Sequence, residues 1–312
     1  MRSAVTLAAE ARKRFAVETH VPTSSIKIAL ALAAYGGSLP LAHEYDGYYP
    51  PPYGPKAYVP QPDPTGPNRN AFRTDERAQE AQSEDALAAF HLERLRVYAS
   101  DKETWRAVDA LAFETIPLAR EVRAIRRAVA ALEDELAPEE RKPWWVCTVY
   151  AAGEFPEGRA EGNGGGGLGA REVLASFFGA VPTAATAGSH KGIRYAVPDA
   201  FGINCTATTH TAGVVAAMSD ALAQLGAANV GCGQPWLVLK PNGGQTYDMD
   251  TRIWDVHDTE KRSPGEEWAR QVGDIVHTAA AKGVWGGILV GGCCKTGEEE
   301  LRALSRILRA HD

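Results

Sequence analysis

The sequence predicts an α/β protein built on a parallel sheet. Short apolar runs alternate with segments of helical periodicity from about residue 26 to the end of the 312-residue chain. The runs lack the polar alternation of half-exposed strands, so we expect strands that are buried on both faces. Repeated strand–helix units join parallel strands through right-handed crossovers, which gives either an open doubly wound sheet or a barrel.

The runs with the length and composition of strands are Ile26–Ala33, Val108–Phe113, Trp144–Tyr150, Ala200–Asn204, Trp236–Leu239 and Gly287–Val290. Between them, apolar residues from Leu118 to Leu132 recur every three or four positions, and Pro117 is placed to open that helix. Thr296 and Glu299 form a capping-box pair ahead of the last helix.

Two segments interrupt the alternation without marking a domain boundary. Residues 48–82 begin with a stretch rich in Pro, Tyr and Gly, so we expect a loop insertion there, placed to act as a lid. Residues 152–170 contain Gly164–Gly167 and are expected to form a flexible Gly-rich loop. The alternation resumes after each segment, so we expect residues 1–312 to form a single domain.

Composition and charge disfavour several classes of partner. The net charge of −6 provides no broad basic field for nucleic acid or anionic lipid. The longest apolar run, residues 26–34, contains Lys27 and is far shorter than the about 20 residues that span a bilayer. The N-terminal segment mixes Arg12 and Arg14 with Glu10, as an amphipathic helix does and a targeting signal does not. An odd number of cysteines, five, suits reduced thiols, so we expect a cytoplasmic protein.

Three of the cysteines lie at the ends of two predicted strands. Cys205 follows one strand, and Cys293 and Cys294 follow the last strand after a Gly-Gly pair that permits a turn. The carboxyl ends of parallel strands form the edge that carries active sites in α/β folds. Three thiolates bind zinc and leave a fourth position open. A thiol that enters this position loses its proton yet stays nucleophilic, so the pattern predicts a site for alkylating sulfur.

Other interpretations remain open for these residues. Cys293 and Cys294 also fit a vicinal redox pair, and Cys147 and Cys232 fit small apolar core residues. The glycines at 162, 164 and 167 have the spacing of a dinucleotide fingerprint, which would indicate a nucleotide-binding α/β enzyme. The preceding strand ends near residue 151, whereas that fingerprint must follow its strand directly.

Several motifs resemble, in order and spacing, those of the homocysteine S-methyltransferase family. They are Tyr35–Ser38, Glu44–Tyr49, Phe113–Pro117, Gly202–Cys205, Pro241–Asp248 and Gly291–Thr296, and the resemblance extends over about residues 3 to 310. It implies a (β/α)8 TIM-type barrel and methyl transfer to homocysteine, giving methionine. It also implies that Cys205, Cys293 and Cys294 hold zinc and carry the catalysis.

The resemblance also implies roles for residues around the zinc. Glu114, with Thr115 beside it, would bind the amino group of homocysteine, although a carboxylate near a helix start is also ordinary. Asn242 would hydrogen-bond the substrate or take the fourth zinc position, and it also fits a plain turn.

The methyl donor is expected to be S-methylmethionine or S-adenosylmethionine. The chain has no room for a corrin or folate module and lacks the C-terminal extension of betaine-using relatives. A sulfonium donor is a cation, so Tyr35, Tyr45 and Tyr49 are candidates to line its pocket.

Relatives begin with a strand carrying Asp-Gly-Gly-x-x-Thr, followed by a second strand, and no counterpart of either is found in this sequence. We therefore expect an N-terminally truncated barrel with strands three to eight. Open sheet edges would favour self-association, and homocysteine turnover would be strongly reduced. The alternative function is a catalytically impaired, zinc-binding member of the family.

Overall fold

The computed structural model describes residues 2–62, 64, 66–159, 166–179, 193–226, 233–243, 248, 251, 253 and 265–310. At its centre is a six-stranded sheet of β1 (Ala29–Ala33), β2 (Ala110–Ile116), β3 (Trp144–Thr148), β4 (Ala200–Asn204), β5 (Trp236–Lys240) and β6 (Gly287–Val290). All neighbouring strands are parallel, and their order in the sheet is their order in the chain. A doubly wound sheet reverses its strand order at a switch point. The uninterrupted order therefore excludes that alternative, and the open sheet fits part of a (β/α)8 barrel.

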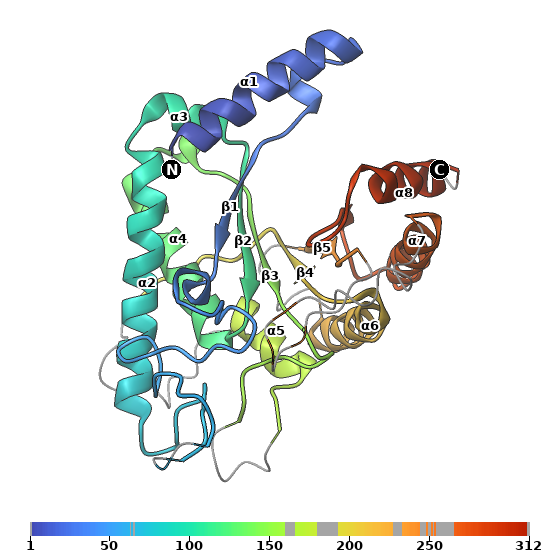
Figure 1. Cartoon of the computed structure of the whole chain (residues 1–312). Coiled ribbons are helices and arrows are strands. Elements are labelled where there is room, and N and C mark those ends of the chain that lie inside the picture. Colours follow the sequence, from blue (N-terminus) through green and yellow to red (C-terminus); the bar gives the residue numbers. More distant parts are fainter. Residues whose placement is uncertain are drawn as a thin grey trace.

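Helices follow the strands around the outside of the sheet. They are α1 (Arg2–Thr19), α2 (Arg77–Ala99), α3 (Lys102–Ala107), α4 (Ala119–Glu135), α5 (Ala170–Phe178), α6 (Thr208–Leu225), α7 (Gly265–Ala281) and α8 (Glu298–Arg309). Figure 1 shows α2, α4, α5, α6, α7 and α8 in an arc on one side of the sheet, with α1 and α3 beyond the starts of β1 and β2. Crossovers of one hand place successive helices on the same face, so none of the described helices that follow a strand covers the concave face of the sheet (Figure 1).

The two faces of the sheet carry different residues. Outward-pointing positions such as Phe113 and Leu239 belong to the main hydrophobic core with residues of the surrounding helices. Residues of the concave face form a smaller cluster around Cys147 and Val238. Glu114 lies two residues before the end of β2, Lys240 is the last residue of β5, and both have the inward-pointing register. Charged side chains therefore lie beyond the apolar layer of the concave face.

The strand predictions are confirmed in number and order, with small shifts in their ends. Residues 200–204 and 287–290 match as predicted, whereas β1 begins three residues later than expected and β2 extends to Ile116. Near its end β2 shifts register between Phe113 and Ile116, because Thr115 adopts a positive φ of 61°. That irregularity lets β2 carry its last residues to the site described below.

Three predicted boundaries are wrong. The cap of the last helix is not Thr296 with Glu299, because Gly297 is the N-cap and its N–H donates to Glu300 Oε2 at 2.8 Å. Pro117 precedes the helix that it was expected to open, since α4 begins at Ala119. The predicted loop over residues 48–82 ends earlier, because α2 begins at Arg77.

Of the Gly-rich segment 152–170, residues 160–165 lie outside the described part, and α5 begins at Ala170. No helix within the described ranges is long and apolar enough to cross a membrane.

Candidate metal centre

Three cysteine sulfurs converge where β4 and β6 end. Cys205 Sγ lies 2.9 Å from Cys293 Sγ and 3.6 Å from Cys294 Sγ, and the two sulfurs of the adjacent cysteines are 4.0 Å apart. All three residues are free thiols, and they form the one metal-ligand cluster found among the described residues. A zinc–sulfur bond is about 2.3 Å long, so two sulfurs on one ion can be at most about 4.6 Å apart. All three separations satisfy that limit.

The backbone turns sharply to bring these sulfurs together. Cys205 has a positive φ of 50°, which non-glycine residues rarely adopt, directly after the end of β4. On the other side, the Cys293 N–H donates to the Pro241 carbonyl and the Gly243 N–H donates to the Cys294 carbonyl, both at 2.9 Å. A Cβ at Gly243 would lie 2.1 Å from the Lys295 carbonyl oxygen, so only glycine permits the two loops to approach this closely. Such strain is typical of functional sites.

The Asn204 side chain lies next to two of the sulfurs and links them to Thr115. Its side chain is buried, its Oδ1 accepts from the Thr115 N–H at 2.8 Å, and its Nδ2 donates to Thr115 Oγ1 at 2.8 Å. The same Nδ2 lies 3.6 Å from Cys205 Sγ and 3.7 Å from Cys293 Sγ. Amide donors aimed at sulfur stabilise its thiolate form.

The thiols are electrostatically coupled. Hydrogen bonds from Cys205 and Cys294 hold the pKa of Cys293 well below its ordinary value, whereas the pKa of Cys205 is raised by its bonds to the same two residues and by burial. Three sulfurs packed this closely cannot all ionise unless a cation offsets their charge. The donor set therefore fits a soft divalent metal.

Glu114 points to the concave face, as a substrate-binding role requires, but it is not free. It forms an ion pair with Lys240, which the sequence had not indicated. The two residues come from β2 and β5, so the pair spans the concave face across β3 and β4. Burial lowers the pKa of Lys240 to about 8.

Asn242 and Tyr45 also border the cluster. Asn242 is buried, its N–H and C=O bond to Thr206 and Trp268, and its Oδ1 has no hydrogen-bond partner within the described part of the chain. Tyr45 packs with Cys205, and its hydroxyl hydrogen-bonds Cys205 and Cys294. Burial and the two neighbouring sulfurs raise the pKa of Tyr45, so the phenol stays protonated and acts as a donor.

A cavity of about 490 Å³ opens beside Tyr45. Tyr48, Phe155, Asp46 and Glu154 also line it, which combines aromatic faces with carboxylates. The expectation that Tyr35 and Tyr49 share this lining with Tyr45 is wrong. Tyr49 is fully buried with its hydroxyl on Glu121 Oε2 at 2.7 Å, and Tyr35 stacks on Tyr53 with ring centroids 3.9 Å apart.

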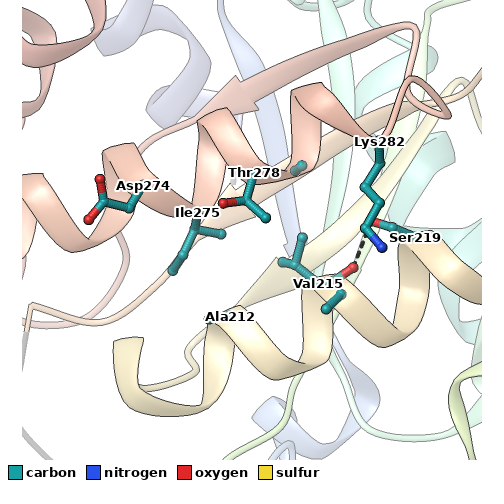
Figure 2. Close-up of a pocket in the computed structure, with 9 residues that line it drawn as sticks. Ala212, Val215, Ser219, Asp274, Ile275, Thr278 and Lys282 are labelled. Atoms are coloured by element: carbon teal, nitrogen blue, oxygen red, sulfur yellow. Dashed lines mark hydrogen bonds between the residues drawn. The ribbon is translucent and has the colours of Figure 1, made fainter.

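A second hollow lies away from the cysteines, between α6 and α7. Figure 2 shows Val215 of α6 and Ile275 of α7 facing each other across it, with Lys282 at one end. Its volume is about 150 Å³, and small side chains such as Ala212 and Ser219 account for the space between the helices. It contains no cluster of reactive groups, so we assign it no role.

Comparison with known proteins identifies the family. The family model for homocysteine S-methyltransferase matches residues 1–308, which is nearly the whole chain. This chain belongs to the homocysteine S-methyltransferase family. Five of the six motifs that suggested the family contribute residues to the cysteine cluster, although residues 244–247 of one of them lie outside the described part. The sixth, Tyr35–Ser38, lies apart from the cysteines, because the Tyr35 N–H donates to Glu121.

Relatives in this family come from bacteria and plants. Homocysteine S-methyltransferase YbgG of Bacillus subtilis is 24% identical, over 98% of this chain and 70% of that protein. Homocysteine S-methyltransferase 4 of Zea mays is 26% identical, over 73% of this chain and 51% of that protein. The chain thus spans about half to seven-tenths of the length of these relatives.

The fold agrees with a solved member of the family. The crystal structure of the metallated form of the homocysteine methyltransferase MmuM from Escherichia coli superposes with a TM-score of 0.55 at 21% identity, covering 98% of this chain and 69% of that one. The likeness supports a TIM-barrel architecture for the family fold.

Sequence reasoning missed two residues of this site. Asn204 stood inside a recognised motif, and its position before Cys205 was the available signal, yet no role followed from it. Lys240 carried no signal at all, because a lysine at a strand end is ordinary and its partner lies 126 residues away.

Proposed function

We propose that this chain holds zinc through Cys205, Cys293 and Cys294 and transfers a methyl group from a sulfonium donor to homocysteine, forming methionine. The convergence of three free sulfurs from two strand ends carries the proposal. Family membership supports the acceptor, and the metallated form of the Escherichia coli homocysteine methyltransferase supports a metal. The three cysteines would hold the zinc, which would lower the pKa of an incoming thiol while leaving its sulfur nucleophilic.

The residues of the chain prepare the reactants. Asn204 donates to two of the sulfurs and fixes their positions through Thr115. Glu114 supplies a negative charge for the ammonium group of homocysteine. The Oδ1 of Asn242, which has no hydrogen-bond partner among the described residues, provides a further acceptor for substrate or metal.

We propose the cavity beside Tyr45 as the donor site. Its aromatic residues Tyr45, Tyr48 and Phe155 and its carboxylates Asp46 and Glu154 suit a sulfonium cation such as S-methylmethionine or S-adenosylmethionine. Methyl transfer from a sulfonium to a thiolate removes two charges, so a site that excludes water favours the step. Donor choice is tested by methionine formation with each sulfonium and with betaine; activity with betaine alone would contradict this assignment.

The zinc assignment is tested by bound metal and by methionine production together. We expect about one zinc per chain, and Cys205→Ser or Cys293→Ser should lose both zinc and activity. Cys147→Ala is the matched control, because Cys147 is a buried free cysteine of the apolar concave-face cluster. Full zinc content and activity in the serine variants would refute the assignment.

A second candidate, zinc binding with little or no turnover, is favoured by the open sheet. No other described strand pairs with the outer sides of its edge strands β1 and β6, and Trp236 and Leu289 are exposed on β5 and β6. We propose that the chain self-associates through these edges and turns over homocysteine slowly. Light scattering and a methionine assay separate the candidates: a monomer with rapid turnover would contradict both statements.

We also propose a cytoplasmic location, which the four free cysteines of the described residues support, because thiols stay reduced there. Fractionation of the producing cells would test it.

A further inference from the structure

The ion pair of Glu114 and Lys240 lies next to the residues that build the cysteine cluster. Glu114 precedes Thr115, whose Oγ1 is 3.7 Å from Cys205 Sγ. Lys240 precedes Pro241, whose carbonyl accepts from the Cys293 N–H. The two opposite charges, which contact each other, therefore lie on the concave face next to the residues that hold the cluster.

The pair is partly exposed to solvent, and neither residue is shared with another ion pair among the described residues. The side chains of Lys240 and Glu114 are 17% and 18% exposed, so part of each is open to solvent. Within the described residues each has the other as its single ion-pair partner. The Lys240 ammonium also lies 6.0 Å from the centre of the Trp145 ring, which orients it over the interior.

The carboxylate of Glu114 and the ammonium of Lys240 suit the ammonium and carboxylate groups of an α-amino acid better than they suit a simple amine. A lone carboxylate would attract any thiol that carries an ammonium group. A carboxylate facing a lysine offers one counter-charge to each end of a zwitterion, so binding exchanges one ion pair for two. Charge-assisted hydrogen bonds of this kind are the strong ones and give specificity.

We propose that Lys240 binds the α-carboxylate of the acceptor thiol, so that Glu114 and Lys240 together restrict the site to zwitterionic amino-acid thiols. The inference rests on the proposed function and names a specificity residue for it. In the ligand-free chain the two side chains hold each other in place, and the zwitterion enters between them.

The test is calorimetric binding of three thiols to the zinc-loaded chain. The probes are L-homocysteine, 3-aminopropane-1-thiol, which lacks the carboxylate, and 4-mercaptobutanoate, which lacks the amine. Lys240→Met should weaken homocysteine binding on the order of 30-fold, yet leave the binding of 3-aminopropane-1-thiol unchanged or tighter, because Glu114 is released. Lys240→Arg should recover most of the homocysteine affinity. Glu114→Gln should weaken both amine-bearing probes and spare 4-mercaptobutanoate.

Two controls separate this role from a structural one. Lys282→Met removes a lysine from an exposed ion pair with Asp220 and should leave all three affinities unchanged. Zinc content and thermal midpoint should stay the same in every variant compared. Homocysteine binding to Lys240→Met that equals or exceeds the wild type would overturn the inference, because a lysine that merely neutralises Glu114 predicts that result. A zinc-loaded wild type that binds none of the three thiols would overturn the proposed function and the inference with it.

Discussion

Two polar clusters lie at the carboxyl ends of the strands, and they differ in how far the chain satisfies them. Glu121, on the first turn of α4, is fully buried and accepts from the Tyr35 N–H at 2.7 Å, Tyr49 Oη at 2.7 Å and His91 Nε2 at 3.0 Å. At the cysteine cluster, by contrast, Asn204 Nδ2 reaches the sulfurs only at 3.6 and 3.7 Å.

The comparison separates a structural anchor from a ligand site. Three protein donors bond to the two carboxylate oxygens of Glu121, and the positive end of the α4 dipole stabilises its charge. This carboxylate therefore needs no ligand to satisfy it. The thiols have weaker partners and repel one another once ionised, so all three can ionise only if a cation offsets their charge. The first cluster also holds Tyr35 and Tyr49, which flank the loop that carries Tyr45 to the second.

The largest effect is expected at the anchor. Glu121→Ala leaves two buried side-chain donors and the half-buried Tyr35 N–H without an acceptor, and should reduce the free energy of unfolding by about 3–5 kcal/mol. Denaturant unfolding measures this. Glu135→Ala, which removes an exposed partner of Arg96, is the control and should show no measurable loss. A loss in Glu121→Ala no larger than in the control would show that the network is not an anchor.

A smaller effect, measured as a loss of metal affinity, is expected from Asn204→Ala. Loss of its donated hydrogen bonds should weaken zinc binding about 10- to 100-fold, as for other groups that orient metal ligands. Competition with a chromogenic chelator gives the affinity. Thr115→Val, which keeps the Asn204 amide next to the sulfurs, should cost less; equal losses would place the effect in the Thr115 hydroxyl.

The anchor should also make stability depend on pH. Burial lowers the pKa of His91 from its ordinary value of about 6.5, while His91 and the other donors lower the pKa of Glu121. Below about pH 6.5 the unfolded chain protonates this histidine and the folded chain does not, so stability is complete above that pH and falls as the pH drops. The slope is at most about 1.4 kcal/mol per pH unit. His91→Gln keeps a donor to Glu121 and should remove this slope from unfolding curves recorded between pH 5 and 8; an unchanged slope would assign it to other groups.

The smallest effect is expected for Tyr45→Phe. The variant removes one neutral hydroxyl from the sulfurs, which is worth about 0.5–1.5 kcal/mol, so zinc affinity should change by about tenfold or less. The same chelator competition measures it. A loss as large as that of Asn204→Ala would mean that Tyr45, and not the amide, is the main support of the cluster.

Much of this arrangement follows from local sequence. The apolar runs that became strands are buried in a parallel sheet, and the position of Cys205, Cys293 and Cys294 after two such runs suffices to place them on one edge, because parallel strands end together. Short-range patterns also determine α4 and α8. The N-cap of α8 is Gly297 and not the predicted Thr296, a difference of one position that leaves the periodicity of the helix unchanged.

Only the tertiary structure determined which side chains meet across the sheet. Glu114 and Lys240 are 126 residues apart, and whether they touch depends on the curvature that turns β2 and β5 toward each other. Tyr35, Tyr45 and Tyr49 lie in one connection, yet their partners differ. The Tyr49 hydroxyl donates to the buried carboxylate of Glu121, whereas the Tyr45 hydroxyl hydrogen-bonds the cysteine sulfurs. Sequence periodicity sets the face on which a residue lies, but the partner on that face depends on packing between segments that local patterns do not relate.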